Sequence, residues 1–290
     1  MKTPIVKALV AILVFSLSAS KTFASPPVNP EDTTRKALLP SIDKTTDSLV
    51  VLKQANVEFP AILTGNESQS LDYIEKFFIS RKNYLVNTYK RSKKIFPKVI
   101  SILKKYNVPE EFKVLLALES GFNGNAVSSA GAVGYWQIMD AVAREYGLKI
   151  ASGKKIKRSA KAAGKKHLVK TITTDDRKNF NKSTHAAARY LKDRGRNLNN
   201  DCLLIAASYN CGVGNVWNAM ERTGLINPTF WDIKKFLPVE TRTYVMNFIT
   251  LNVLFNNYEK FSKNTLCFKP VTCKEEIREQ EEADDCTSSL

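Results

Sequence analysis

The chain has 290 residues, of which 43% are hydrophobic and 25% are charged, and its formal net charge is +16. These values are those of a soluble globular protein with one substantial domain and extensions, or with two small domains. The excess of positive charge favours acidic partners, which could be nucleic acid, an anionic lipid surface or cell-wall glycan.

The first 24 residues have the pattern of a secretory signal peptide. Lys2 and Lys7 accompany an apolar run over residues 8–19, and Ala24 is a small residue at the expected cleavage position. The apolar run is too short to span a membrane comfortably, so we expect cleavage near Ala24 and export to the periplasm or cell envelope. An uncleaved N-terminal anchor is the alternative. Export removes most of the case for a nucleic-acid partner.

The segments on either side of the central region differ from it in pattern. Residues 25–67 contain scattered prolines and no sustained hydrophobic period, which predicts an extended N-terminal arm. Residues 68–100 show helical periodicity and predict a helical extension packed on the domain that follows. Residues 259–290 are polar and finally acidic, and we expect a partly disordered tail.

Residues 101–258 predict a mainly α domain without internal repeats. Apolar residues recur at helical spacing in most of its segments, and glycines or prolines separate them. The helices expected after residue 100 lie at about 110–120, 141–146, 183–195, 203–209, 215–224 (capped by Asn215) and 244–255. A basic stretch at about 153–172 interrupts the pattern and predicts a solvated surface insertion.

Glu119 is the most informative single residue of this region. It lies in the last turn of a helix that has almost no polar face and that ends at Gly121. Apolar surroundings and the negative end of the helix dipole both disfavour a carboxylate, so we expect a raised pKa. A carboxyl group that stays protonated near neutral pH can donate a proton to a glycosidic oxygen. The structural alternative is an acid that is paired with Lys or Arg at a helix end.

A segment rich in glycine and aromatic residues follows Glu119. Gly131 and Gly134 suggest a tight hairpin that ends in Tyr135, Trp136 and Gln137. Aromatic faces next to an amide are typical of sugar sites, although buried aromatic side chains more often belong to a core. The pair Tyr209 and Asn210, at the end of an apolar helix, allows the same two interpretations.

Other chemistries find little support in the sequence. Cys211 could be a nucleophile, but the only histidines are His167 and His185, and His167 lies in the basic insertion. No cluster of His and Cys has metal-ligand spacing, and no glycine loop has the phosphate-binding pattern, so we expect no metal and no cofactor. The five cysteines leave at least one unpaired; Cys267 and Cys273 could close a short loop, and we assign no connectivity.

Four motifs in order resemble one family. These are Glu119-Ser120, the run from Gly131 to Met139, the run from Ser208 to Gly212, and the run from Glu240 to Val245. Together they resemble lytic murein transglycosylases with a soluble-lytic-transglycosylase (SLT) domain, in particular the membrane-bound lytic murein transglycosylase D type. The resemblance covers roughly residues 70–258.

The resemblance implies a lysozyme-like (goose-type/SLT) domain with an N-terminal helical extension. It also implies an enzyme that cleaves the β-1,4 bond between N-acetylmuramic acid and N-acetylglucosamine in peptidoglycan glycan strands, and leaves 1,6-anhydro ends. In that family the glutamate that matches Glu119 acts first as acid and then as base. By the same analogy seven residues would bind substrate or orient Glu119, namely Ser120, Gln137, Met139, Tyr209, Asn210, Glu240 and Tyr244.

Two departures from the family pattern keep alternatives open. Asp140 stands where the family commonly has Pro, which adds an acid that could activate water in a hydrolase such as a muramidase. The basic insertion is longer than the pattern suggests, and it could supply affinity for the cell wall. A catalytically silent wall-binding protein is the third hypothesis, and an association with the membrane or the wall is left undecided.

Overall fold

The structure is a computed structural model that describes residues 49–151 and 174–275. The predicted signal peptide, the first part of the predicted arm, the basic insertion and the end of the predicted tail lie outside these residues. The described residues belong to two compact units. One is a helical unit over Asn56–Phe268, and the other contains two short strands, β1 and β2.

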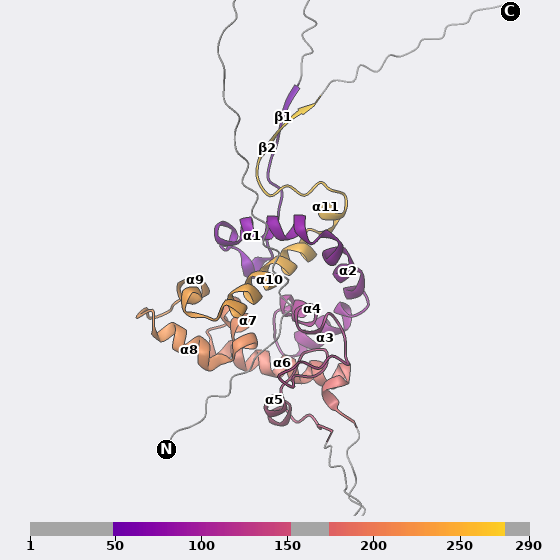
Figure 1. The fold of residues 1–290 in the computed structure, drawn as a ribbon, viewed down its shortest axis with the longest axis vertical. Helices are drawn as coiled ribbons and strands as arrows, with labels where there is room; N and C mark the ends of the chain where they lie inside the picture. The colour runs from indigo at the N-terminus through magenta and orange to yellow at the C-terminus, as the bar shows by residue number, and fades with distance from the viewer. Residues whose placement is uncertain (1–48, 152–173, 276–290) are drawn as a thin grey trace, which may run out of the picture. The chain divides into compact units, whose positions relative to one another are not determined.

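The helical unit carries the fold (Figure 1). Its α-helices are α1 (Glu67–Ser80), α2 (Lys82–Ser92), α3 (Phe96–Lys105), α4 (Leu115–Ser120), α5 (Asp140–Glu145), α6 (Phe180–Asn197), α7 (Cys202–Cys211), α8 (Val213–Glu221), α9 (Phe230–Ile233), α10 (Val239–Asn256) and α11 (Tyr258–Ser262). Its 3₁₀ helices are η1 (Ala61–Leu63), η2 (Glu110–Val114), η3 (Asp176–Lys178) and η4 (Lys234–Phe236). The prediction of a mainly α fold is confirmed.

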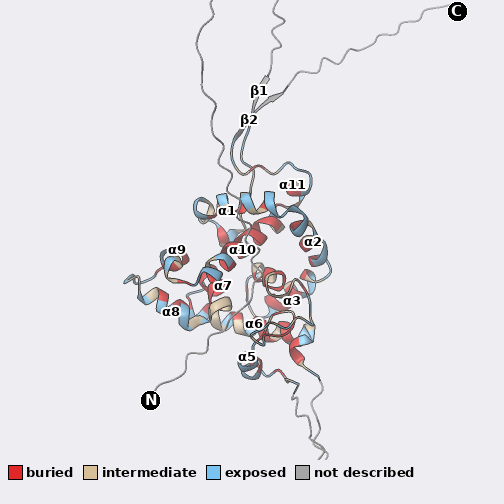
Figure 2. Cartoon of the chain, in the orientation of Figure 1, coloured by how far each residue is buried: buried red, intermediate tan, exposed pale blue. Residues whose placement is uncertain are grey.

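Helix α10 forms the centre of the hydrophobic core. It is buried along most of its length, as Figure 2 shows, because nearly every turn carries apolar side chains on all faces. It packs against α7, α1 and α4, and Phe248 contacts the ring of Phe112 at a centroid distance of 5.5 Å. A central helix that touches so many others can hold side chains from distant parts of the sequence next to one another.

The helices before residue 106 follow the predicted pattern. The stripe of α3 is buried at Val99, Ile102 and Leu103, and the ring of Phe96 meets that of Phe122 edge to face at 5.8 Å. Pro97 occupies the first turn of α3, where its missing N–H leaves no bond unmade. Helix α3 thus packs on the chain that follows it, through Phe96 and Phe122.

The second unit contains an antiparallel strand pair that the sequence pattern did not predict. Strand β1 is Leu49–Lys53 and strand β2 is Val271–Glu275, in the register that pairs Leu49 with Glu275 and Lys53 with Val271. β1 lies in the predicted arm and β2 in the predicted tail. Helical periodicity cannot detect this pairing, because its two partners are more than two hundred residues apart.

Two further findings concern individual predictions. Asn215 is not the N-cap of α8; Gly212 is, and the Asn215 side chain instead donates to the carbonyl oxygen of Cys211 at 2.6 Å.

Over the described ranges 49–151 and 174–275, none of the helices has the length and apolar character to cross a bilayer.

Candidate active site

Glu119 is positioned by a short buried helix with a defined end. The chain from Glu110 winds through η2 into α4, whose residues Leu115, Leu116 and Ala117 are buried. Gly121 ends the helix in the left-handed conformation, with φ of +53°, and its N–H donates to the carbonyl oxygen of Ala117 at 3.1 Å. The carboxyl group therefore emerges from the last helical turn, as predicted.

The surroundings of Glu119 keep its carboxyl group protonated at higher pH than usual. Burial raises the pKa of Glu119 to about 7, while a hydrogen bond from Tyr244 works in the opposite direction. That bond runs from Tyr244 Oη to Glu119 Oε1 at 2.5 Å and joins α10 to α4. Glu119 has no ion pair within residues 49–151 and 174–275, so the alternative of a Lys- or Arg-paired structural acid does not apply.

The glycine-rich segment folds into the predicted tight turn. Isolated bridges join Val133 to Val127 and to Ile138, and Gln137 has a positive φ of 48°, which is costly for a non-glycine residue. Its Nε2 donates to the carbonyl oxygens of Ala126 and Gly134, at 3.2 and 2.8 Å. The side-chain nitrogen of Gln137 is thus used to hold the turn, which leaves its oxygen as the group that can accept a bond from a ligand.

Arg177, from η3, holds this turn in place. Its guanidinium is 5% exposed, donates to the carbonyl oxygen of Ile138 at 3.3 Å, and pairs with Asp175 and Asp140. Gly134 lies directly against this residue, since a Cβ on Gly134 would be 2.0 Å from the carbonyl oxygen of Arg177. The sequence pattern did not single out Arg177. The two acids that precede it were the only indication of an ion pair, and such neighbours are common on protein surfaces.

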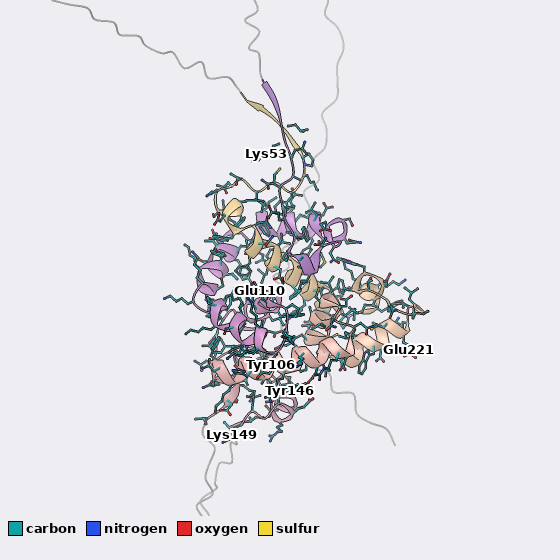
Figure 3. All side chains as sticks on the ribbon, turned by 180° about the vertical axis from the view of Figure 1, so that it is seen from behind. Lys53, Tyr106, Glu110, Tyr146, Lys149 and Glu221 are labelled. Carbon is teal, nitrogen blue, oxygen red and sulfur yellow. The ribbon has the colours of Figure 1, made fainter. Side chains whose placement is uncertain are left out.

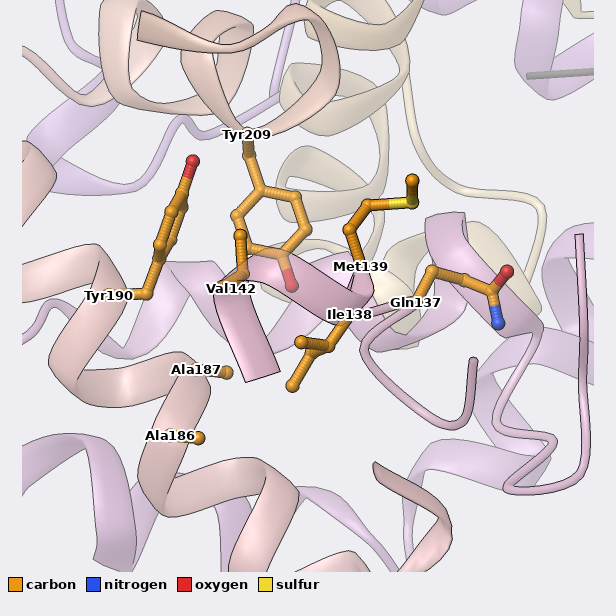
Figure 4. Close-up of a pocket in the computed structure, with 8 residues that line it drawn as sticks. All are labelled: Gln137, Ile138, Met139, Val142, Ala186, Ala187, Tyr190 and Tyr209. Atoms are coloured by element: carbon orange, nitrogen blue, oxygen red, sulfur yellow. The ribbon is translucent and has the colours of Figure 1, made fainter. Parts of the chain in front are cut away.

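A small pocket lies beside this turn (Figure 4). Its volume is about 70 Å³, and we call it the tyrosine pocket; it is lined by Gln137, Ile138, Met139, Val142, Ala186, Ala187, Tyr190 and Tyr209. Burial raises the pKa of both tyrosines, and the charge of Glu119 adds to the effect on each. The turn that contributes Gln137 and Met139 to this pocket is bonded, through the carbonyl oxygen of Tyr135, to Ser120, the residue that follows Glu119.

The structure brings most of the predicted site residues to this region. Met139 lines the tyrosine pocket and is 37% exposed, and Tyr209 donates its hydroxyl to the carbonyl oxygen of Trp136 at 2.7 Å. Ser120 donates to the carbonyl oxygen of Tyr135 at 2.8 Å, so its hydroxyl ties α4 to the turn. Each of these bonds positions a group near Glu119.

Asn210 lies at the end of α7, and Glu240 lies at the start of α10. Asn210 Oδ1 accepts a hydrogen bond from the Thr241 hydroxyl at 2.8 Å, which fixes the end of α7 against α10. Glu240 is exposed and one helical turn before Tyr244, hence on the same face of α10. Glu240 thus shares a helix face with Tyr244, whose hydroxyl bonds Glu119.

The structure decides two alternatives that the sequence left open, at Trp136 and Asp140, and adds Tyr190. Trp136 is completely buried and donates its Nε1 proton to Thr184 Oγ1 at 3.0 Å, so it belongs to the core and offers no face to a sugar. Asp140 is bound to Arg177, which counters the idea of a free acid that activates water. Tyr190, which was missed, meets Tyr209 edge to face at 5.6 Å; its helical spacing from Ala186 could have revealed it.

No metal site is evident in the described chain. No group of three or more His, Cys, Asp or Glu residues within 49–151 and 174–275 has metal-binding geometry. In the same ranges, Cys202 and Cys211 form no disulfide, and burial raises the pKa of the Cys211 thiol. A thiol with a raised pKa is a poor nucleophile, in keeping with the sequence argument against a Cys/His pair.

The chain is similar to known proteins over part of its length. Residues 99–227 match the model of the transglycosylase SLT domain family. Membrane-bound lytic murein transglycosylase D of Escherichia coli K12 is 28% identical over 186 residues, which cover 63% of this chain and 36% of that protein; the same enzyme of Escherichia coli O6:H1 gives the same values. The chain thus spans about a third of the length of these relatives.

Solved structures give weaker likenesses. The lytic transglycosylase Slt of Pseudomonas aeruginosa is 20% identical, with a TM-score of 0.41 over 58% of this chain and 24% of that one. The 70 kDa soluble lytic transglycosylase of Escherichia coli is 17% identical, with a TM-score of 0.41 over 73% and 39%. The matched segment 99–227 begins within α3 and includes Glu119, the glycine-rich turn, the tyrosine pocket and Asn210. Over this segment the chain is similar to the transglycosylase SLT domain family.

Proposed function

We propose that this protein is a peptidoglycan lytic transglycosylase, a lyase that cleaves the β-1,4 bond from N-acetylmuramic acid to N-acetylglucosamine and forms 1,6-anhydro ends. The single observation that carries the proposal is Glu119: a carboxyl group with a pKa of about 7 and no ion pair among the described residues, beside a pocket of the matched SLT segment. The relatives that the chain matches are named as lytic murein transglycosylases.

In the first step Glu119 acts as the acid. The protonated carboxyl group gives its proton to the oxygen that leaves with N-acetylglucosamine, and the bond from that oxygen to C1 of the muramic sugar breaks. The positive charge that develops at the sugar is stabilised by the carboxylate that remains. The hydrogen bond from Tyr244 to Glu119 supports this step, because it grows stronger as the carboxyl group becomes charged.

In the second step the same residue acts as the base. The Glu119 carboxylate takes the proton from the C6 hydroxyl of the muramic sugar, and the C6 oxygen forms a bond to C1. This closes the 1,6-anhydro ring and returns Glu119 to its protonated form, so no water is consumed. A pKa of about 7 suits both steps, since neither form of the group is then strongly favoured at neutral pH.

Mass spectrometry of the soluble products tests the reaction. Incubation with peptidoglycan sacculi should release muropeptides that are lighter by one water than the reducing forms. Glu119→Gln should abolish release, whereas Glu221→Gln, at the end of α8 (Figure 3), should not change it. A strongly active Glu119→Gln variant would contradict the assignment.

The hydrolase alternative predicts reducing ends in the same experiment. It requires a second carboxylate to activate water. Asp140 is engaged by Arg177, so Glu240, on the Tyr244 face of α10, is the better candidate for that role. Reducing ends that disappear in Glu240→Gln would favour hydrolysis and replace the proposal; anhydro ends exclude it. A protein that pellets with sacculi and releases nothing would favour the wall-binding hypothesis.

We also propose that the protein acts in the periplasm or cell envelope, in cell-wall remodelling, with peptidoglycan as its partner. The basic segment 153–172 lies outside the described residues, but its flanks are joined: the N–H of Asp176 donates to the carbonyl oxygen of Lys149 at 2.8 Å. Deletion of this segment should therefore leave the helical unit folded. If the segment adds wall affinity, the deletion reduces pelleting with sacculi; unchanged pelleting ends that idea.

A further inference from the structure

A second pocket includes Tyr135, from the glycine-rich turn, among its lining residues. Its volume is about 440 Å³, and we call it the lysine pocket; its principal lining residues are Lys94, Lys98, Tyr135, Asn179, Phe180 and Asn181. Tyr135 and Gln137 are two residues apart, so their Cα atoms lie within about 7 Å of each other. Gln137 lines the tyrosine pocket, so the two pockets are lined by residues of the same turn.

The lining of the lysine pocket is cationic and rich in hydrogen-bond donors. Lys94 and Lys98 are exposed, and neither forms an ion pair within residues 49–151 and 174–275. Asn179 caps α6 through its Oδ1, which accepts from the N–H of Lys182 at 3.0 Å, so its side-chain NH₂ can still donate. Asn181 adds a second amide at the same helix start.

No carboxylate neutralises this lining. Of the described residues that form the lysine pocket none is acidic, and the nearest acids in sequence are already bound. Asp175 pairs with Arg177, and Asp176 pairs with Lys182. The pocket is therefore a local excess of positive charge, and the starts of α3 and α6 add the positive ends of their dipoles.

The pocket also has an apolar wall and room for more than a small ion. Tyr135 meets Phe180 edge to face at a centroid distance of 5.4 Å, and both side chains are partly exposed. A volume of this size is within the range of pockets that hold organic ligands of several heavy atoms. Cationic groups over an aromatic wall suit a ligand that carries both a carboxylate and an aliphatic chain.

We propose that the lysine pocket binds the acidic stem peptide of the glycan strand that occupies the neighbouring tyrosine pocket. That the strand is peptidoglycan rests on the proposed function. The further inference is that Lys94 and Lys98 recognise the stem peptide of this strand. A carboxylate of the stem accepts hydrogen bonds from one or both ammonium groups, while its aliphatic part packs on Tyr135. The pocket thereby makes strands that carry stems better ligands than bare glycan.

Binding of two strand preparations tests the proposal. Soluble glycan strands with intact stems and the same strands after amidase removal of the stems are titrated against the full chain that carries Glu119→Gln, so that no strand is cleaved. The test variant adds Lys94→Gln and Lys98→Gln. The control adds Lys76→Gln and Lys105→Gln, which remove the same charge from exposed positions outside the lysine pocket.

We expect the parent to bind stem-bearing strands more tightly than bare strands. The test variant should raise the dissociation constant for stem-bearing strands about fivefold, the scale of two exposed charge contacts, and leave that for bare strands unchanged. The control variant should change neither, and all three proteins should melt at the same temperature.

Two results would overturn the proposal. One is that the parent binds stem-bearing and bare strands with equal dissociation constants. The other is that the test variant loses the same affinity for both strands, which would mean that the lysines contact the glycan backbone and not the stem. The proposed function fails separately, through the absence of anhydro products, because binding is measured without turnover. A stem preference without turnover would therefore leave the lysine pocket assigned and remove only the reaction.

Discussion

Replacement of Tyr244 by Phe isolates the contribution of one hydrogen bond to the acid that carries the reaction. The bond from Tyr244 Oη to Glu119 Oε1, at 2.5 Å, favours the charged form of Glu119 and so holds down a pKa that burial raises. A hydrogen bond to a charged group contributes roughly 1.5–3 kcal/mol, and 1.36 kcal/mol corresponds to one pKa unit. The pKa of Glu119 should therefore rise from about 7 to roughly 8 or 9.

The pH dependence of kcat/KM measures this shift. Because Glu119 must be protonated to start the reaction, activity falls as pH rises through its pKa, and this alkaline limb should move upward by about one to two pH units in Tyr244→Phe. Tyr106→Phe is the matched control, since the Tyr106 hydroxyl bonds His185 Nδ1 instead, and its profile should follow that of the parent. An alkaline limb that stays in place, or moves down, would refute the role given to Tyr244.

Three further predictions concern stability. Burial raises the pKa of Glu119 from its ordinary value of 4.5 to about 7, so the parent loses stability as pH rises from about 4.5 to 7. Glu119→Gln should therefore be about 3 kcal/mol more stable than the parent at pH 8 and equal to it at pH 4, as measured by urea unfolding. Gly134→Ala should lower the free energy of unfolding by about 3 kcal/mol or more, because the added Cβ would overlap the backbone of Arg177. Gly131→Ala is the control: it has the same φ of +86° but open space around it, so the loss should be about 1–2 kcal/mol in thermal unfolding. Equal losses in the two variants would contradict the contact between Gly134 and Arg177. Arg177→Gln breaks the buried ion pair with Asp175 and should lower the free energy of unfolding by about 3–5 kcal/mol. Arg196→Gln, which breaks an exposed ion pair, should lower it by at most about 1 kcal/mol. Similar guanidinium midpoints for the two variants would show that the buried ion pair contributes little to stability.

Local sequence patterns were enough to predict the helical architecture and to single out Glu119. Helical periodicity identified the buried face of α3 and the apolar helix that ends at Gly121, because both are set by neighbours within one or two turns. The same local information predicted the raised pKa of Glu119, since an acid at the end of an apolar helix has few polar neighbours. The motif order then indicated the family, and the match of residues 99–227 agrees with it.

Tertiary structure decided which side chains meet. Tyr244 is 125 residues from Glu119, and nothing in the local pattern shows that its hydroxyl reaches that carboxyl group. Packing also decided that Trp136 lies in the core and that Arg177 binds Asp140. Periodicity says that a side chain is buried or exposed; it does not say what lies opposite.

The lysine pocket illustrates the same division. Lys94 and Lys98 follow one another at helical spacing in a basic stretch, where each looks like an ordinary solvated side chain. Only the fold brings them into one pocket with Tyr135 and Asn179, which belong to segments distant in sequence. The packing of α3 against α6 brings these segments together. Short-range sequence preferences form the helices, but they do not determine which helices pack against one another.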